Sequence, residues 1–139
     1  AAGGADVVIH GRRSREAAVA SAEEAHRLGA RAEVVMADVS TPVGCGALRP
    51  ALDGTAGLAE VKRMYTRPEA RRRGVSRAIL AGLEDAARAF GYRRIQLETG
   101  TRQPEAMTLY ETAGYHRIPP YGEFRDDPLS VCYAKDLHP

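Results

Sequence analysis

Residues 64 to 80 of the chain are MYTRPEARRRGVSRAIL. The residues that lead into this run, from Glu60 onward, predict a strand, and its last residues predict the start of a helix. Between them lies a short basic loop that ends at Gly74. A helix N-terminus leaves backbone N–H groups unpaired and carries partial positive charge. The stretch therefore predicts a phosphate-binding site, with a solvated basic turn as the alternative.

The positive charge is local to this region of the chain. Lysine and arginine together number 20 and aspartate and glutamate 18, which gives a formal net charge of +2. Proteins that bind nucleic acid usually carry a broad basic face, so the composition favours a small polyanionic ligand instead. No apolar run has the length that crossing a membrane requires, and no signal peptide is visible. We therefore expect a cytoplasmic protein without nucleic-acid or membrane partners.

The length of 139 residues predicts a single domain over residues 1–139. Its two cysteines, Cys45 and Cys132, lack metal-ligand spacing and lie in apolar, strand-like runs. This pattern predicts buried thiols in a reducing compartment and no metal site.

From residue 43 onward the pattern predicts a mixed β-sheet with flanking helices, which is an α/β fold. Strands are expected at 43–48, 57–66, 94–99, 115–118 and 129–137, with a hairpin turn over 49–56. Helices are expected at 74–90 and from Pro104 to just before Gly114. The longer helix carries an apolar stripe made of Val75, Ile79, Leu83, Ala86 and Phe90.

The first forty residues predict a βαβ unit, with strands at 6–10 and 32–39 and a helix at 14–28. Such a unit favours a parallel strand pair. The segments GADVVIHGRR from residue 4, LGA from 28 and ADVS from 37 resemble part of a short-chain dehydrogenase, over residues 3–41. The Gly-rich turn and the Tyr-x-x-x-Lys pair of that family are missing, so we expect no NAD chemistry.

The remainder of the chain resembles a different family. The pattern Arg71-x-x-Gly74-x-Ser76 resembles the pyrophosphate loop of the GCN5-related N-acetyltransferases, Gln/Arg-x-x-Gly-x-Gly/Ala, although Ser76 stands where the family has Gly or Ala. Further similar segments are EVKRMYTRPE from residue 60, LETGTRQPEA from 97, LYETAGY from 109 and SVCYAKDL from 130. The resemblance covers residues 43–137. It implies an acetyltransferase core that binds acetyl-CoA or CoA and transfers acetyl to an unknown amine.

The resemblance also implies roles for individual residues. Pantetheine would pair with the free edge of a strand that splays from its neighbour. Tyr110 would give a proton to the leaving thiolate, since a phenol with a pKa near ~10 stays protonated at neutral pH; packing is its alternative role. Glu60 would be the base, and an exposed strand-end carboxylate is its alternative role. The expected cofactor-binding residues are Met64, Tyr65, Thr66, Arg71, Arg72, Arg73, Gly74, Val75, Ser76 and Arg77.

The two resemblances together predict a chimera, either natural or made de novo by recombination. A folded, non-catalytic domain that keeps the acetyltransferase motifs only as structure is the alternative function. A third possibility is a module that binds some other phosphate compound. Exposed sheet edges can pair between two copies of the chain, so the sequence leaves open whether the protein forms a homodimer.

Overall fold

A computed structural model describes residues 7–11, 32–36 and 43–138. Strands β1 (Val7–Gly11) and β2 (Ala32–Met36) form a separate two-stranded sheet. They run parallel, with Val7 opposite Ala32, which confirms the predicted strand pair. The helix expected at 14–28 lies outside the described residues.

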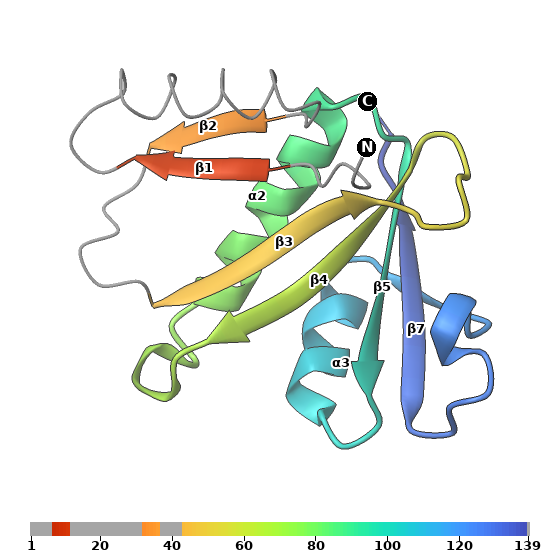
Figure 1. Ribbon diagram of the computed structural model, residues 1–139. Coiled ribbons are helices and arrows are strands. Elements are labelled where there is room, and N and C mark those ends of the chain that lie inside the picture. Colours follow the sequence, from red (N-terminus) through yellow and green to blue (C-terminus); the bar gives the residue numbers. More distant parts are fainter. Residues whose placement is uncertain (1–6, 12–31, 37–42, 139) are drawn as a thin grey trace.

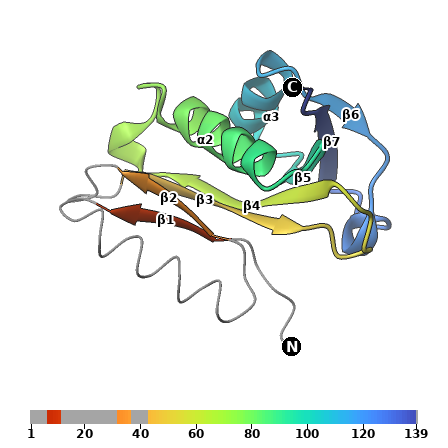
Figure 2. The same cartoon turned by 90° about the horizontal axis from the view of Figure 1, so that it is seen from above.

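A five-stranded mixed sheet organises residues 44–136, in the order β3-β4-β5-β7-β6. Its strands are β3 (Gly44–Pro50), β4 (Leu58–Thr66), β5 (Arg94–Gly100), β6 (His116–Ile118) and β7 (Ser130–Asp136). Only β4 and β5 are parallel neighbours, and the other pairs are antiparallel. Helices α2 (Val75–Ala89) and α3 (Pro104–Thr112) lie on one face of the sheet (Figure 1). The short helix η2 (Gly122–Phe124) lies on the other (Figure 2).

The hydrophobic core lies between the sheet and the two helices. Ile95 and Leu97 of β5 pack there with Leu80 of α2, and each exposes 1% of its surface or less. The predicted apolar stripe of α2 is partly wrong, because the buried face includes Leu80 while Val75 is only half-buried. The first turn of α2 lies beside a groove instead of over the core, so its apolar residue is left partly open.

Strand β3 packs closely under α2 through two glycines. A Cβ on Gly44 would come within 2.7 Å of the Ile79 side chain, and one on Gly46 within 2.8 Å of Leu83. Because side chains alternate along a strand, Cys45 between them faces away from α2. The prediction of a buried thiol is therefore wrong for Cys45, which is exposed, and confirmed for Cys132.

Strands β4 and β5 are paired along only part of their lengths. The ladder joins Leu58–Val61 to Arg94–Leu97 and then stops. Beyond it β4 continues to Thr66 and β5 to Gly100, and Figure 1 shows the two strands diverging. This confirms the predicted splay, and beyond that point no described strand pairs with the inner backbone edge of β4 or β5.

Candidate functional site

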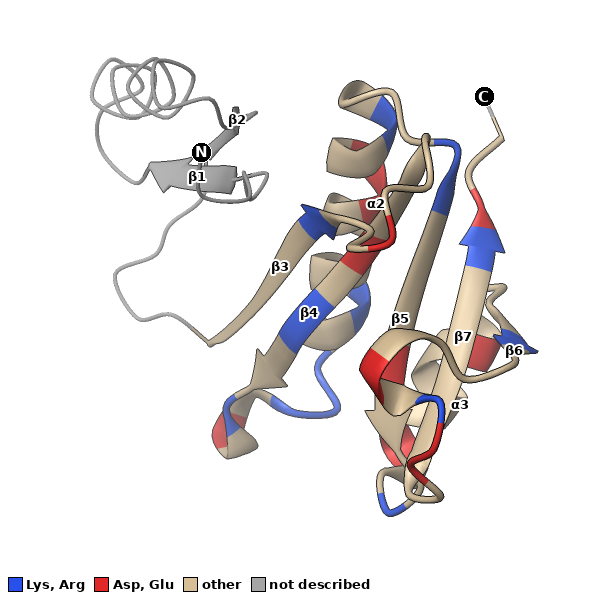
Figure 3. Ribbon diagram, turned by 45° about the vertical axis from the view of Figure 1, so that its right-hand side comes forward, with Lys and Arg blue, Asp and Glu red and all other residues tan. Residues whose placement is uncertain are grey.

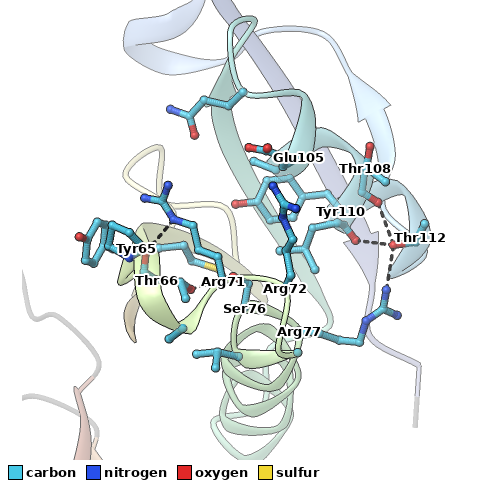
Figure 4. Close-up of a pocket in the computed structure, with 18 of the residues that line it drawn as sticks. Tyr65, Thr66, Arg71, Arg72, Ser76, Arg77, Glu105, Thr108, Tyr110 and Thr112 are labelled. Atoms are coloured by element: carbon cyan, nitrogen blue, oxygen red, sulfur yellow. Dashed lines mark hydrogen bonds between the residues drawn. The ribbon is translucent and has the colours of Figure 1, made fainter. Parts of the chain in front are cut away.

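A large groove of about 1080 Å³ lies between the splayed end of β4, the first turn of α2 and α3. Figure 4 shows side chains from β4 on one side of it and from α3 on the other. The volume is slightly above the usual range for small-molecule and cofactor pockets. Four arginines and one glutamate line it, for a formal charge of +3. Those residues are Arg71, Arg72, Arg77, Arg102 and Glu105.

The groove brings together the residues that the sequence predicts for cofactor binding. Nine of the ten predicted residues line it, and Arg73 does not. The nine are Met64, Tyr65, Thr66, Arg71, Arg72, Gly74, Val75, Ser76 and Arg77. They come from the end of β4, the basic loop over 67–74 and the first turn of α2. A short 3-10 helix, η1 (Pro68–Ala70), shapes the start of that loop.

The N-terminus of α2 has the features of an anion site. Gly74 occupies the N-cap position with φ 78°, and no side chain caps the first turn of the helix. Arg72, two residues earlier, also has a positive φ, of 59°. Left-handed conformations in a turn form backbone N–H concavities that bind anions. Space around Gly74 is open, since a Cβ at this position would meet no other described residue within 4 Å.

Two of the groove arginines are tied to its walls. The Nε of Arg71 donates to the Thr66 carbonyl oxygen over 3.2 Å, and the Nη2 of Arg77 donates to the Thr112 hydroxyl over 3.2 Å. No hydrogen bond or ion pair joins Arg72 to another described residue. Arg72 is therefore the lining residue of the basic loop whose guanidinium remains available to a ligand.

Ser76 makes a contact that sequence reasoning did not anticipate. Its hydroxyl oxygen lies 2.7 Å from the Thr66 hydroxyl oxygen, which joins the start of α2 to the end of β4. Thr66 is buried and Ser76 half-buried, and both line the groove. The bond holds the two walls of the anion site together.

Tyr110 lies on α3, and its hydroxyl points into the groove (Figure 4). Its ring packs between those of Tyr115 and Tyr133, with centroids 5.9 Å and 5.8 Å away. Burial raises the pKa of the phenol above 10, and the negative charge of Glu98 raises the pKa further. Tyr110 therefore stays protonated at neutral pH and can act as a donor.

Glu60 lies outside the large groove, on the face of the sheet opposite the helices. The alternative role predicted for Glu60, an exposed carboxylate at a strand end, is wrong, because Glu60 exposes only 2% of its surface. Its Oε2 accepts from the Nε of Arg49 over 2.9 Å and lies 2.7 Å from the Nη2. Its Oε1 lies 3.0 Å from the Nζ of Lys62 and accepts from the Tyr121 hydroxyl over 3.0 Å. A carboxylate has about four acceptor sites, and all four are filled here.

Glu98 is a carboxylate near the site that sequence reasoning missed. It follows Leu97, the last β5 residue paired with β4, and is half-buried. The Ser130 hydroxyl donates to its Oε1 over 2.7 Å, and no other contact to a described residue occupies the carboxylate. Its charge acts on both Tyr110 and Tyr121. Nothing in the sequence shows where the β4–β5 ladder stops, so only the observed pairing marks this residue.

The described residues contain neither a cluster suited to a metal ion nor a helix suited to a membrane. No group of three or more His, Cys, Asp or Glu side chains in that part of the chain is arranged to hold a metal ion. None of its helices combines the length and the apolar character that crossing a membrane requires.

Comparison with known proteins establishes the family. The model of the Acetyltransferase (GNAT) family matches residues 10–115, and the chain belongs to this family. It is 42% identical over 97 residues to the IAA acetyltransferase of Azospirillum brasilense, covering 70% of this chain and 62% of that protein. The mixed sheet with its flanking helices is the fold of the family's solved structures.

Two solved structures show this likeness. A Klebsiella pneumoniae protein described as an acyl-CoA N-acyltransferase has a TM-score of 0.63 at 36% identity, over 69% of this chain and 64% of that one. PaiA N-acetyltransferase from Thermoplasma acidophilum, solved in complex with coenzyme A, has a TM-score of 0.57 at 18% identity, over 68% and 53%. The chain thus spans about six tenths of the length of the relatives it matches.

Proposed function

We propose that the chain binds acetyl-CoA in the large groove and transfers the acetyl group to an amine. The observation that carries this proposal is the uncapped N-terminus of α2, set among groove arginines where β4 and β5 part. A diphosphate with its negative charges matches that site. The extended pantetheine arm matches the unpaired edge of β4. Membership of the family agrees with both.

In the proposed reaction acetyl-CoA supplies the activated thioester. Backbone N–H groups of β4 near Met64, Tyr65 and Thr66 polarise its carbonyl oxygen. The amine nitrogen forms a bond to the carbonyl carbon and the carbon–sulphur bond breaks. Tyr110 protonates the departing thiolate. Because the pKa of Tyr110 is raised, its phenol still carries the proton at neutral pH when the carbon–sulphur bond breaks.

Two carboxylates compete for the role of base toward the amine. Glu60 is the one that the family resemblance suggests, but Arg49, Lys62 and Tyr121 fill its acceptor sites. It could accept a proton only when the acceptor displaces one of these groups, and Lys62 is the partner most readily replaced by another ammonium. Glu98 keeps an oxygen without a contact to the described residues and therefore needs no displacement.

Replacing each carboxylate by its amide separates these roles. We expect Glu98→Gln to lower kcat by about 100-fold with little change in unfolding free energy, because it removes a base and little packing. We expect Glu60→Gln to lower unfolding free energy by about 1–3 kcal/mol, because it leaves Arg49 and Lys62 without their buried counter-charge. Urea unfolding and steady-state kinetics measure both. A Glu60→Gln enzyme that is stable but inactive, beside an active Glu98→Gln enzyme, would assign the base to Glu60.

Release of CoA thiol in the presence of primary amines tests the proposed activity, with mass spectrometry of the acetylated amine as the second readout. Amine-dependent release is the expected result. A folded chain that binds acetyl-CoA and yet transfers nothing to any amine would favour the alternative, a non-catalytic domain that keeps the motifs as structure.

We also propose that the chain is a chimera acting as one domain, with residues 3–41 derived from a short-chain dehydrogenase. The parallel pairing of β1 and β2 supports this, although the acetyltransferase match already begins at residue 10. A cytoplasmic location is proposed because Cys45 and Cys132 are free thiols. An experimental structure with residues 7–11 antiparallel to 32–36 would mark an ordinary acetyltransferase start instead.

A further inference from the structure

A second, small pocket lies on the face of the sheet opposite α2 and α3. Its volume is about 130 Å³, and it shares no lining residue with the large groove. Its floor is formed by Glu60 of β4 and Gln96 of β5, which are register partners in the ladder. The β3–β4 turn at Leu52 and Asp53 forms one wall, and the segment 121–124 forms the other. Figure 3 shows where charged residues lie along β4.

Gln96 is the feature of this pocket that points to a ligand. It exposes only 7% of its surface, yet no hydrogen bond joins its side-chain amide to any residue that the structure describes. Among the described residues only Tyr115 has a fully buried side-chain polar atom without a partner, so the Gln96 amide is open to the small pocket. Its register partner Glu60 is already bonded to Arg49, Lys62 and Tyr121. A ligand group that both accepts and donates hydrogen bonds would satisfy this amide.

The charges around the pocket select a neutral group. A carboxylate entering it would meet Asp53, Glu60 and Glu123. An ammonium would have to compete for Glu60 with Arg49 and Lys62, and Lys62 is also held 4.5 Å from the Phe124 ring centre. A neutral carboxamide or hydroxyl avoids both conflicts. The volume equals that of about four water molecules, which suits such an end group and the methylenes beside it.

The position of the pocket connects it with the proposed reaction. Gln96 lies one residue before the end of the β4–β5 ladder, and Glu98 lies one residue after it. By alternation both side chains point to the same face, ~7 Å apart along the strand. A ligand end group on Gln96 would therefore reach the opening between the strands with its other end after about five or six bonds.

We propose that the small pocket binds the acceptor, and that Gln96 selects a primary amine with a neutral polar end group about five or six bonds from its nitrogen. This inference rests on the proposed function for the role of the amine, whereas the binding of the end group stands by itself. Gln96 would be a specificity-determining residue, and Glu98 would lie beside the reacting nitrogen.

The test compares four amines of equal length and different ends: 5-aminopentanamide, 5-aminopentanoate, 1,5-diaminopentane and hexylamine. Titration of the full 15N-labelled chain with 5-aminopentanamide is expected to shift the side-chain NH2 signals of Gln96. The dissociation constant for this amide is expected to be roughly tenfold lower than for the other three. Gln96→Leu should remove that preference, and Gln96→Glu should transfer it to the diamine, both with unchanged acetyl-CoA affinity.

Equal affinity for all four amines, unshifted Gln96 signals, or a preference that survives in Gln96→Leu would overturn the inference. The acetyl-transfer assay on the same samples keeps the two proposals apart. Binding of the amide at Gln96 without acetyl transfer would contradict the proposed function and leave the pocket assignment standing. Transfer to all four amines at equal rates would support the proposed function and contradict the pocket assignment.

Discussion

Tyr110→Phe is expected to lower kcat by about 100-fold to 1,000-fold while acetyl-CoA binds with unchanged affinity. The substitution removes one hydroxyl that faces the groove, and with it the proton offered to the leaving thiolate. No hydrogen bond joins this hydroxyl to another described residue, so the unfolding free energy should stay within ~1 kcal/mol of the parent. Because burial raises the pKa of Tyr110 above 10, the loss should be constant across the neutral pH range.

Tyr115→Phe is the matched control. Tyr115 is 4% exposed, against 5% for Tyr110, and its ring lies 5.9 Å from that of Tyr110. Its hydroxyl is buried with no hydrogen-bond partner among the described residues, and it does not line the groove. Removing it should leave kcat unchanged. Steady-state kinetics of both variants with calorimetric acetyl-CoA affinities measures the difference, and equal kcat values for the two would exclude Tyr110 as the acid.

Gly74→Glu is expected to weaken acetyl-CoA binding by about 100-fold or more. The new carboxylate would stand at the N-terminus of α2, where the space is open and where the helix dipole already favours negative charge. It would therefore occupy the place of the phosphates and repel them. The fold should survive, because a carboxylate in the first turn of a helix is locally favourable and offsets part of the strain of a side chain at φ 78°.

Gly91→Glu controls for that strain. Gly91 follows the C-terminal end of the same helix with φ 82°, and a Cβ at this position would meet no other described residue within 4 Å. The two variants thus change the same charge, on glycines of nearly equal conformation, at opposite ends of α2. Calorimetric titration should show parent-like affinity for Gly91→Glu. Equal weakening in both would mean that general strain, and not the anion site, explains the effect.

The sequence predicted the elements of the larger sheet because their signals are local. Alternation marked β5, and Gly74 and Gly91 marked the limits of α2 to within a residue. The groove could be predicted as well, since the basic loop and the helix start are contiguous in the chain. Tyr110, which comes from a separate helix, was included only through resemblance to a family.

The misses concern features that depend on which face a strand turns to its neighbours. Cys45 lies in an apolar run, but Gly44 and Gly46 turn toward α2, so the thiol points away from it. Glu60 looked like an exposed strand end, whereas it is buried beneath Arg49, its partner across the β3–β4 hairpin, and Tyr121, which is far from it in sequence. Both outcomes depend on contacts between segments that no local pattern connects.

The end of the β4–β5 ladder is the clearest case of this kind. Pairing stops at Val61 and Leu97 because the strands diverge, and that point determines which carboxylate lies at the opening. Glu98 carries no signal of its own in the sequence. Its position becomes meaningful only when the register with β4 and the charge it exerts on Tyr110 are known.

The most direct test of the central claim is calorimetric titration of the full chain with acetyl-CoA, with ADP as the reference ligand. The uncapped helix, the groove arginines and the free edge of β4 predict micromolar binding, at least about tenfold tighter than ADP because pantetheine adds contacts along the strand. Equal affinity for the two ligands would mean that the groove binds phosphate groups in general and makes no contacts with pantetheine. No heat of binding from a folded sample would contradict the account.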